Sequence, residues 1–226
     1  MIDPKLGLID KRDSFEIILD QLCGILLVES ARQFELAQAA GKDPKLWDML
    51  VYQERSNPFE EFLHATGAST PAPIVNVWYD TSSYQKAGSD VVRKQRAEST
   101  YNIDVIGGGV AHDQQHGHAP GDKAAVQAVH RTLRLCRNIV MAAEYTYLAL
   151  PRTFVAGRWP DSLQKFQPTT GDNRPIMNVV GARLTLTVTH NEYAPQIEGD
   201  DLDLISVTVE DDGEVKLVDV DYDKTG

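Results

Sequence analysis

Hydrophobic residues recur at steps of three and four positions in two long stretches of this chain, and such spacing predicts amphipathic helices. The first predicted helix spans Ser14 to about Ala40 and stops at Gly41, a residue type that commonly follows a helix. Asp13 or Ser14 can cap its first turn, where Glu16 favours the positive end of the helix dipole.

The second predicted helix covers Asp122 to Leu150 and has the stronger pattern. It would be on the order of 40 Å long, because each helical residue adds about 1.5 Å. Pro151 cannot continue the helix and ends it. Its apolar positions alternate steps of three and four without interruption: Val126, Val129, Leu133, Cys136, Val140, Ala143 and Tyr147.

Elsewhere the hydrophobic period becomes that of β-strands. Residues 74–79 and 99–106 are rich in β-branched and aromatic residues and predict a hairpin. Its connection, residues 81–98, is polar and predicts a long loop or a short helix. Short helices are also predicted over residues 45–52 and 59–63.

The last third of the chain is dominated by strand patterns. Residues 152–178 predict a loop with a strand or two, and Ala182 to Thr189 alternates apolar and polar side chains as a half-buried strand does. Residues 203–210 and 214–220 flank Asp211-Asp212-Gly213, and an Asp-Gly turn between two such runs predicts a hairpin.

This order of elements predicts an α+β fold. An antiparallel or mixed sheet would pack against the long amphipathic helix, with an N-terminal helical region added. We expect the helical region in residues 1–65, and the sheet domain with its C-terminal acidic hairpin in residues 66–226. Consecutive hairpins argue against a doubly wound parallel sheet.

The composition is that of an ordinary globular protein, with 42% apolar and 24% charged residues among 226. A net charge of −11 argues against general nucleic-acid binding and against attachment to anionic lipid. We expect no signal peptide and no membrane span, because the apolar runs are too short. Cys23 and Cys136 are expected to be buried free thiols, which fits a protein made in the cytoplasm.

Charge is divided unevenly along the chain. Residues 1–120 contain 17 acidic and 11 basic residues, residues 121–190 contain 4 and 9, and residues 191–226 contain 12 and 2. Basic and acidic blocks on one subunit can attract each other between copies and build rings or filaments. The alternative is a solvated acidic tail that keeps the protein in solution.

Three arginines follow at steps of three on the second predicted helix. Because a planar guanidinium can hold a carboxylate through two hydrogen bonds, this stripe is a candidate docking surface for an acidic partner, such as the acidic hairpin of a neighbouring copy. An ordinary solvated helix face has the same pattern. The interface candidates are Arg131, Arg134, Arg137, Asp211, Asp212 and Glu214.

The densest group of metal-ligand side chains is His112, His116 and His118, together with Asp113. Such a set can hold zinc or nickel. However, the spacing matches no known metal motif, and Gly117 argues against a helix that would align the rings. We interpret the segment as a polar loop and predict no metal site.

Gly107-Gly108-Gly109 follows a predicted strand, as phosphate-binding loops do. Neither a Lys-Ser or Lys-Thr pair nor the G-x-G-x-x-G pattern accompanies it, so we predict no nucleotide or other cofactor and expect a mobile or closely packed loop. Nucleophile-elbow, His-Glu-x-x-His and Cys-x-x-Cys patterns are also missing, and we predict no enzymatic activity.

The layout of the chain resembles that of tail terminator and neck proteins of tailed bacteriophages. The resemblance covers residues 70–222 and is one of element order rather than of a specific motif. It rests on the strands Ile74–Tyr79 and Tyr101–Ile106, the run Gly107-Gly108-Gly109, the helix Asp122–Leu150, the strand Gly181–Thr189 and the hairpin at residues 208–214.

The resemblance implies a virion structural protein, assembled in the host cytoplasm, whose copies form a homo-oligomer. A hexameric ring would close the head-proximal end of the tail tube and contact a neck or head-completion protein, and the tail sheath if the tail contracts. DNA would pass through the lumen without specific binding, since acidic side chains repel phosphates. Alternatives are another head–tail connector, a baseplate adaptor, or a metal-dependent enzyme that uses the His112, His116 and His118 segment.

Overall fold

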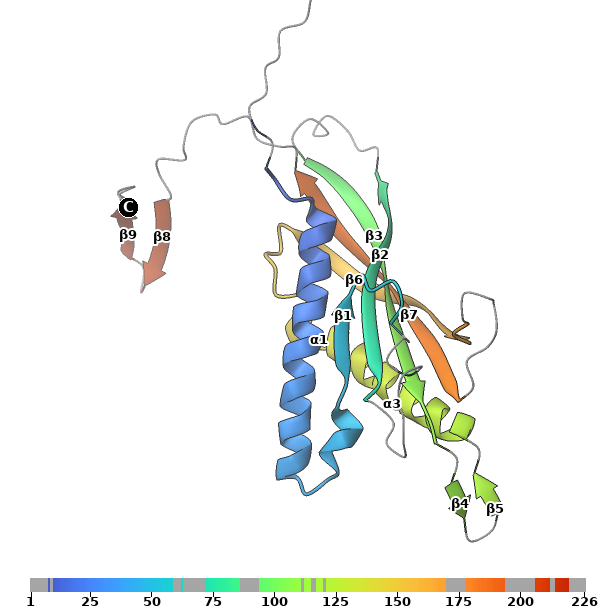
Figure 1. Cartoon of the computed structure of the whole chain (residues 1–226). Coiled ribbons are helices and arrows are strands. Elements are labelled where there is room, and N and C mark those ends of the chain that lie inside the picture. Colours follow the sequence, from blue (N-terminus) through green and yellow to red (C-terminus); the bar gives the residue numbers. More distant parts are fainter. Residues whose placement is uncertain are drawn as a thin grey trace, which may run out of the picture. The chain divides into compact units, whose positions relative to one another are not determined.

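A computed structural model of the chain describes residues 8, 10–58, 62, 72–85, 94–110, 121–169 and 178–193, and the backbone of residues 112–114, 117–119, 206–211 and 214–219. The chain forms two units, residues 12–194 and residues 1–11 with 195–226. The helices and strands are, in chain order, α1 (Ser14–Ala39), η1 (Pro44–Trp47), β1 (Leu50–Gln53), β2 (Ile74–Tyr84), β3 (Lys94–Gly108), β4 (His112–Gln114), β5 (Gly117–Ala119), α3 (Gly121–Val140), η3 (Ala143–Tyr145), β6 (Val155–Phe166), β7 (Val179–Tyr193), β8 (Ser206–Asp211) and β9 (Glu214–Asp219) (Figure 1).

Five strands of the larger unit form one mixed sheet in the order β1-β2-β3-β7-β6 (Figure 1). β1 runs parallel to β2, and the other neighbours are antiparallel. The central strands β3 and β7 pair along their whole lengths, from Lys94 opposite Tyr193 to Gly108 opposite Val179. The strands predicted over residues 74–79, 99–106 and 182–189 are therefore confirmed, as is the antiparallel pairing of the first two.

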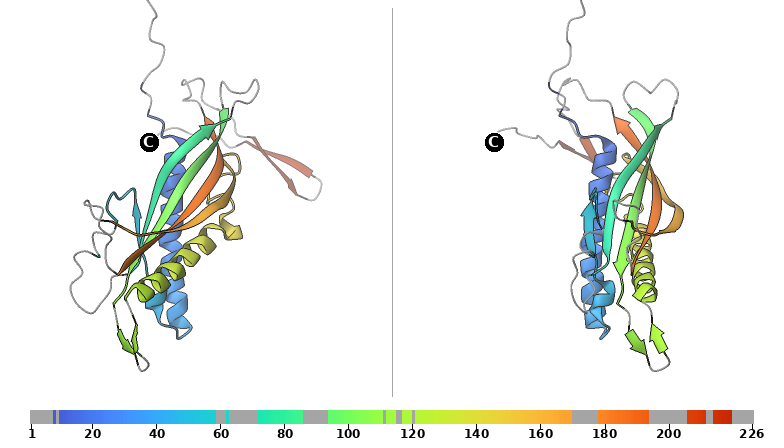
Figure 2. Two further views of the ribbon diagram at one scale, coloured as in Figure 1. Left: turned by 90° about the vertical axis from the view of Figure 1, so that its right-hand side faces the viewer. Right: turned by 45° about the vertical axis from the view of Figure 1, so that its right-hand side comes forward.

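Side-chain alternation turns one face of the sheet toward the helices. Tyr101, Ile103 and Val105 of β3 lie on that face, together with Leu184 and Leu186 of β7. α1 packs on the side of β1 and β2, α3 packs on β3 and β7, and both helices share one buried core with the sheet (Figure 2). The fold is thus α+β with a mixed sheet and an N-terminal helix, as predicted.

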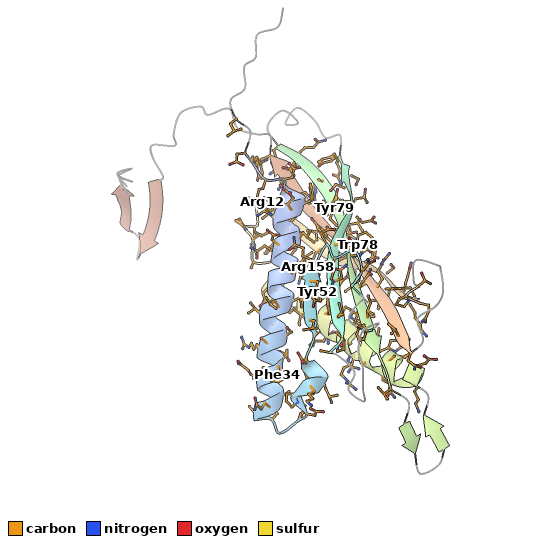
Figure 3. All side chains as sticks on the ribbon, viewed as in Figure 1. Arg12, Phe34, Tyr52, Trp78, Tyr79 and Arg158 are labelled. Atoms are coloured by element: carbon orange, nitrogen blue, oxygen red, sulfur yellow. The ribbon has the colours of Figure 1, made fainter. Side chains whose placement is uncertain are left out.

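The N-terminal helix α1 begins at its predicted residue. The backbone N–H of Asp13 donates a hydrogen bond to the Glu16 carboxylate at 3.0 Å, as in a capping box. Phe15 stacks on Tyr79 with ring centroids 4.3 Å apart, and its carbonyl accepts a hydrogen bond from the Tyr101 hydroxyl (Figure 3). These contacts attach the first turn of α1 to the sheet.

The same turn is bound to the end of β7. The Ser14 backbone N–H donates to the Glu192 carboxylate at 3.0 Å, and the Ser14 hydroxyl donates to the Asn191 carbonyl at 3.1 Å. Ser14 and Glu192 are 178 positions apart in the sequence. The beginning and the end of the larger unit are therefore held together.

The helix predicted over Asp122–Leu150 is shorter in the structure, because α3 ends at Val140. There the guanidinium of Arg158 on β6 donates to the carbonyl oxygens of Val140 and Ala142, the latter at 2.7 Å (Figure 3). These carbonyls are acceptors that a helix end leaves unpaired. The apolar period continues beyond the helix because the following turns also pack on the core, where Leu148 is fully buried with a left-handed φ of 53°.

The prediction of a short helix over residues 45–52 is wrong beyond its first turn. The Asp43 carboxylate accepts a hydrogen bond from the Lys45 N–H at 3.1 Å and starts the single turn η1. Leu50 to Gln53 then pairs in parallel with Ile74 to Val77 of β2. Pairing with a neighbouring strand has overridden the local helical pattern.

The polar connection predicted over residues 81–98 is also wrong where the structure describes it. β2 extends to Tyr84 and β3 begins at Lys94, so the two strands continue their pairing through polar residues. Cross-strand hydrogen bonds replace apolar packing there, as between the Ser82 and Ser99 hydroxyls at 2.6 Å. The strand predicted within residues 152–178 is confirmed as the 12-residue strand β6.

The glycine run at the end of β3 packs closely against α3. A β-carbon at Gly107 would lie 2.9 Å from a methyl group of Val129, and one at Gly109 would collide with the carbonyl oxygen of Gly121. The run is closely packed, as one of the two expectations had it, but Gly107 and Gly108 belong to β3 rather than to a loop. The glycines allow β3 and α3 to approach each other.

In the smaller unit, β8 and β9 form an antiparallel hairpin, with Ser206 opposite Asp219 and Asp211 opposite Glu214. The predicted C-terminal hairpin is thereby confirmed, although its turn at Asp212-Gly213 lies outside the described residues. The predicted helical turn over residues 59–63 lies largely outside them. So does the domain boundary at residues 65 and 66, which stays a prediction.

Candidate functional site

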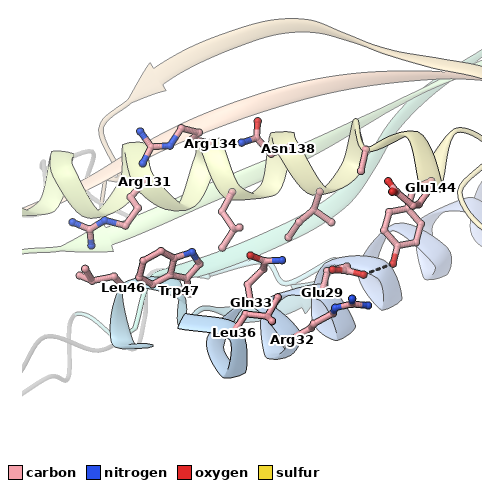
Figure 4. A pocket seen from close by; sticks show the side chains of 14 residues that line it. Glu29, Arg32, Gln33, Leu36, Leu46, Trp47, Arg131, Arg134, Asn138 and Glu144 are labelled. Atoms are coloured by element: carbon pink, nitrogen blue, oxygen red, sulfur yellow. Dashed lines mark hydrogen bonds between the residues drawn. The ribbon is translucent and has the colours of Figure 1, made fainter. Parts of the chain in front are cut away.

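A groove with a volume of about 670 Å³ lies between α1, η1 and α3 (Figure 4). All three elements contribute side chains because η1 lies beside both helices. The lining from α1 and η1 includes Glu29, Arg32, Gln33, Leu36, Leu46 and Trp47. The lining from α3 and the turns after it includes Arg131, Arg134, Leu135, Asn138, Ile139, Glu144 and Tyr145.

Three arginines give this groove its charge. Arg131 and Arg134 lie on α3 near Trp47, and Arg32 lies on α1 (Figure 4). None of the three forms a salt bridge with any described residue. Because a guanidinium carries five N–H donors in a planar fork, Arg131 and Arg134 can bind carboxylates of another chain.

The other end of the groove carries the acidic side chains Glu29 and Glu144. Glu29 accepts a hydrogen bond from the Tyr145 hydroxyl at 2.6 Å, and this bond raises the pKa of Tyr145. The bond joins α1 to the turn after α3 and closes that end of the groove (Figure 4). Charge therefore changes along the groove, from Arg131 and Arg134 to the two glutamates.

The walls of the groove are partly apolar and open to solvent. Leu36 on α1 is 50% exposed and Leu46 on η1 is 38% exposed. Trp47 lies beside them, with the Lys42 ammonium 5.7 Å from its ring centroid. A surface that combines unpaired arginines with exposed leucines suits a segment in which acidic and aliphatic residues alternate.

The structure brings together two of the three arginines predicted as a docking stripe. Arg131 and Arg134 line the groove, whereas Arg137 is exposed on α3 outside it. On the hairpin, Asp211 stands opposite Glu214. Asp212 lies outside the described residues. The side chains of all three acidic candidates do too, so their interface role stays a prediction.

The sequence did not predict which residues of α1 and η1 line the groove beside Arg131 and Arg134. Arg32 and Leu36 lie on the helix before the sheet, and Trp47 lies on η1, all of them at least 84 positions before Arg131. No local pattern connects such distant positions, since the packing of α1 beside α3 creates the groove. The exposed apolar residues of α1 were the available signal.

Exposed apolar residues lie on α1 and on the edge strand β6 of the larger unit. On α1, which packs at the β1 side of the sheet, Leu27 is 57% exposed and Val28 is 64% exposed. On β6, the strand at the other edge, Trp159 is 39% exposed and Leu163 is 51% exposed. The two lie on opposite faces of the sheet, because Trp159 pairs with Thr187 and Leu163 pairs with Leu184 of the core. Exposed apolar clusters commonly mark sites of protein association.

The sheet face opposite the helices carries a second hollow, of about 470 Å³. Arg183 there binds Asp104 through two hydrogen bonds of 2.6 and 2.8 Å, and the Trp78 indole N–H donates to the same carboxylate at 3.0 Å. The Arg183 guanidinium also lies 4.8 Å from the Trp78 ring centroid and 5.7 Å from that of Phe166. Because these partners satisfy one another, the group is best explained as structural.

A serine and a histidine lie within hydrogen-bond distance in the core, as the nucleophile and the base of a hydrolase do. The Ser99 hydroxyl lies 2.7 Å from His190 Nε2, and Ser82 and Tyr79 extend this chain of hydrogen bonds. Yet Ser99 is 0% and His190 1% exposed, so no substrate can reach them. Burial lowers the pKa of His190. The arrangement is a polar connection inside the core rather than a nucleophile with its base.

The histidine segment differs from the predicted loop in its backbone. β4 and β5 form a short hairpin with Asp113 opposite His118, while His116 and all side chains of the segment lie outside the described residues. Elsewhere in the described part, no three His, Cys, Asp or Glu residues converge on one point. Cys23 and Cys136 are free thiols, and burial raises the pKa of each to about 12.

Comparisons with known proteins identify no relative for this chain. No protein-family model matches it, and a search of curated proteins finds no significant match. Among the described residues, no helix has both the length and the apolar character needed to cross a membrane.

Proposed function

We propose that this protein is a structural subunit of a phage virion, a tail terminator whose copies join head to tail into a ring. The observation that carries the proposal is that one unit exposes apolar residues on two different elements: Leu27 and Val28 on α1, and Leu163 on β6, the edge strand farthest from β1. Two different surfaces on one subunit permit a heterologous contact, in which each copy uses both.

Such contacts close into a ring when the rotation between copies divides a full turn, and otherwise continue as a filament. The position of the surfaces favours a contact between α1 of one copy and β6 of the next. β6 is poorly suited to simple strand addition, because Pro160 and two register shifts interrupt it. Side chains of β6 rather than its backbone would therefore make the contact.

The resemblance to tail terminator and neck proteins supports the choice among ring-forming proteins. The resemblance rests on the order of the β2–β3 hairpin, α3, β7 and the C-terminal hairpin, and the chain has these elements in that order, with a shorter α3. The proposed ring is a hexamer at the head-proximal end of the tail tube, in contact with a neck protein and with the sheath of a contractile tail. Its role would be structural rather than catalytic, in the virion.

The proposal is tested by the mass and shape of the purified protein. Light scattering and negative-stain microscopy should show a ring of several copies, and Val28→Glu should shift it toward monomer because a charge cannot be buried unpaired in the contact. Gln38→Glu, an exposed change on the same helix, is the control. A ring unchanged by Val28→Glu would contradict the proposed contact, and binding to portal complexes instead of tube ends would favour another connector.

A further inference from the structure

We propose that the groove between α1, η1 and α3 binds the acidic C-terminal segment, residues 195–226, of a second copy of this chain. The inference deepens the proposed function, since it names a second contact between neighbouring subunits. It depends on that function only in requiring that copies meet. The main evidence is that Arg131 and Arg134 line the groove and form no salt bridge with any residue that the structure describes.

Charge complementarity identifies the segment. Residues 195–226 contain 11 acidic and 2 basic residues, the strongest acidic excess in the chain. Asp211, the last residue of β8, stands opposite Glu214, the first residue of β9, and Asp212 lies between them in the sequence. Carboxylates close together are what two neighbouring arginines bind best.

The hairpin also needs a surface to pack on. A two-stranded hairpin is marginally stable alone in water. Packing against the exposed Leu36 and Leu46 and the indole of Trp47 would stabilise it. The register places Val207, Val209 and Val218 on one face of the hairpin, together with Asp211 and Glu214, and this face is the one that suits the groove.

The dimensions of groove and hairpin agree. α3 lines the groove from Arg131 to Ile139 and the lining continues to Ala142, which corresponds to about 17 Å at 1.5 Å per residue. Each strand of the hairpin has six residues, which corresponds to about 20 Å at 3.3 Å per residue. The glutamates at the far end of the groove would repel the acidic tip, so the tip is placed at Arg131 and Arg134.

Binding is measured with a fluorescent peptide of residues 195–226. The receptor is the full-length chain with Asp211→Asn, Asp212→Asn and Glu214→Gln, so that its own segment competes weakly. We expect saturable binding that weakens as salt rises, because both partners are charged. Adding Arg131→Glu and Arg134→Glu should weaken it at least tenfold.

Arg137→Glu is the matched control, because Arg137 has the same charge on the same helix but lies outside the groove. It should leave the affinity within about twofold, as expected for a rim charge without a direct contact. Equal losses from the Arg137 change and the groove changes would overturn the proposal, and so would absence of peptide binding. Thermal unfolding of each variant checks that the receptor is folded.

Mixing two variants distinguishes a second copy from the chain's own segment. Arg131→Glu/Arg134→Glu removes the groove but keeps the acidic tip, and the tip-neutralised chain keeps the groove. Both variants also carry Val28→Glu, which removes the proposed contact between α1 and β6. If the groove contact joins two copies, the mixture should form a heterodimer that neither variant forms alone, visible by mass photometry. No heterodimer would overturn the inference and would leave the proposed function intact, because the ring is tested separately by Val28→Glu alone.

Discussion

α1 and α3 cover the same face of one sheet, yet their outward surfaces differ. On α3 the exposed positions are polar, among them Lys123, Gln127, His130 and Arg137. On α1 the exposed positions include Leu27, Val28 and Leu36, although the opposite side of the helix is already buried in the core. A helix that is apolar all round is normally buried all round.

The fold explains the buried residues of both helices, but it does not explain the exposed apolar residues of α1. α3 has the surface of a helix that packs once, on the sheet, and meets solvent on its other side. α1 has the surface of a helix that packs twice. The first contact is visible in the core, and the second is the one that we assign to a neighbouring copy. The following variants test whether α1 and α3 differ in what their buried and exposed sides contribute to stability.

A large effect is expected where β3 meets α3. Gly109→Ala should destabilise the protein by about 3 kcal/mol, because its β-carbon would collide with the carbonyl oxygen of Gly121. Gly24→Ala on α1 is the matched control, since nothing lies within 4 Å of its β-carbon. It should stabilise by about 0.5–1 kcal/mol through helix propensity. Denaturant unfolding measures both, and a well-tolerated Gly109→Ala would show that α3 can move away from β3.

The next effect concerns the end of α3. Arg158→Met keeps much of the side-chain volume but removes the donors to the Val140 and Ala142 carbonyls. We expect a loss of about 1–3 kcal/mol, the cost of leaving partly buried acceptors unpaired. Arg158→Lys should recover part of it. If Arg158→Met unfolds like the parent protein, then the turn after Val140 is held by Leu148 and its neighbours instead.

Acid should weaken the region beneath the start of α1. Burial lowers the pKa of His190, so below about pH 6.5 the unfolded chain takes up a proton that the folded chain resists. Stability is therefore present above this pH and falls as pH decreases, by up to about 1.4 kcal/mol per pH unit. His190→Gln should flatten the decline between pH 7 and pH 5 in unfolding experiments.

His130→Gln serves as the control for this pH experiment, because His130 is exposed on α3. A decline of the same steepness in His190→Gln and in the parent protein would mean that other groups, not the buried histidine, determine the acid sensitivity.

The smallest effect is expected on the outward side of α1. Leu27→Gln should change the stability of the monomer by less than about 0.5 kcal/mol, since Leu27 is 57% exposed. Leu22→Ala, on the buried side of the same helix, should cost about 2–5 kcal/mol. Both are measured at concentrations at which the protein is dissociated. A large loss from Leu27→Gln would mean that α1 already packs twice within one chain.

The fold was predictable from the sequence wherever one local rule determined the structure. The alternation from Ala182 to Thr189 and the cap at Asp13 are examples, and the structure bears out both. Prediction failed where distant residues decide. The end of α3 depends on Arg158, and β1 depends on pairing with β2. Only one side of the groove could be predicted from the sequence. Arg131 and Arg134 form a recognisable stripe on one helix, whereas Arg32 and Trp47 join them through tertiary packing.

The contact between Ser14 and Glu192 has a consequence for synthesis of the protein. α1 is synthesised before every strand of the sheet, but one of its anchors follows 178 residues later, which takes about 9–36 s at 5–20 residues per second. The two partners of the first turn, Asn191 and Glu192, stand at the end of β7. During synthesis α1 can therefore dock on β1 and β2 well before its first turn is attached to the last strand of the sheet.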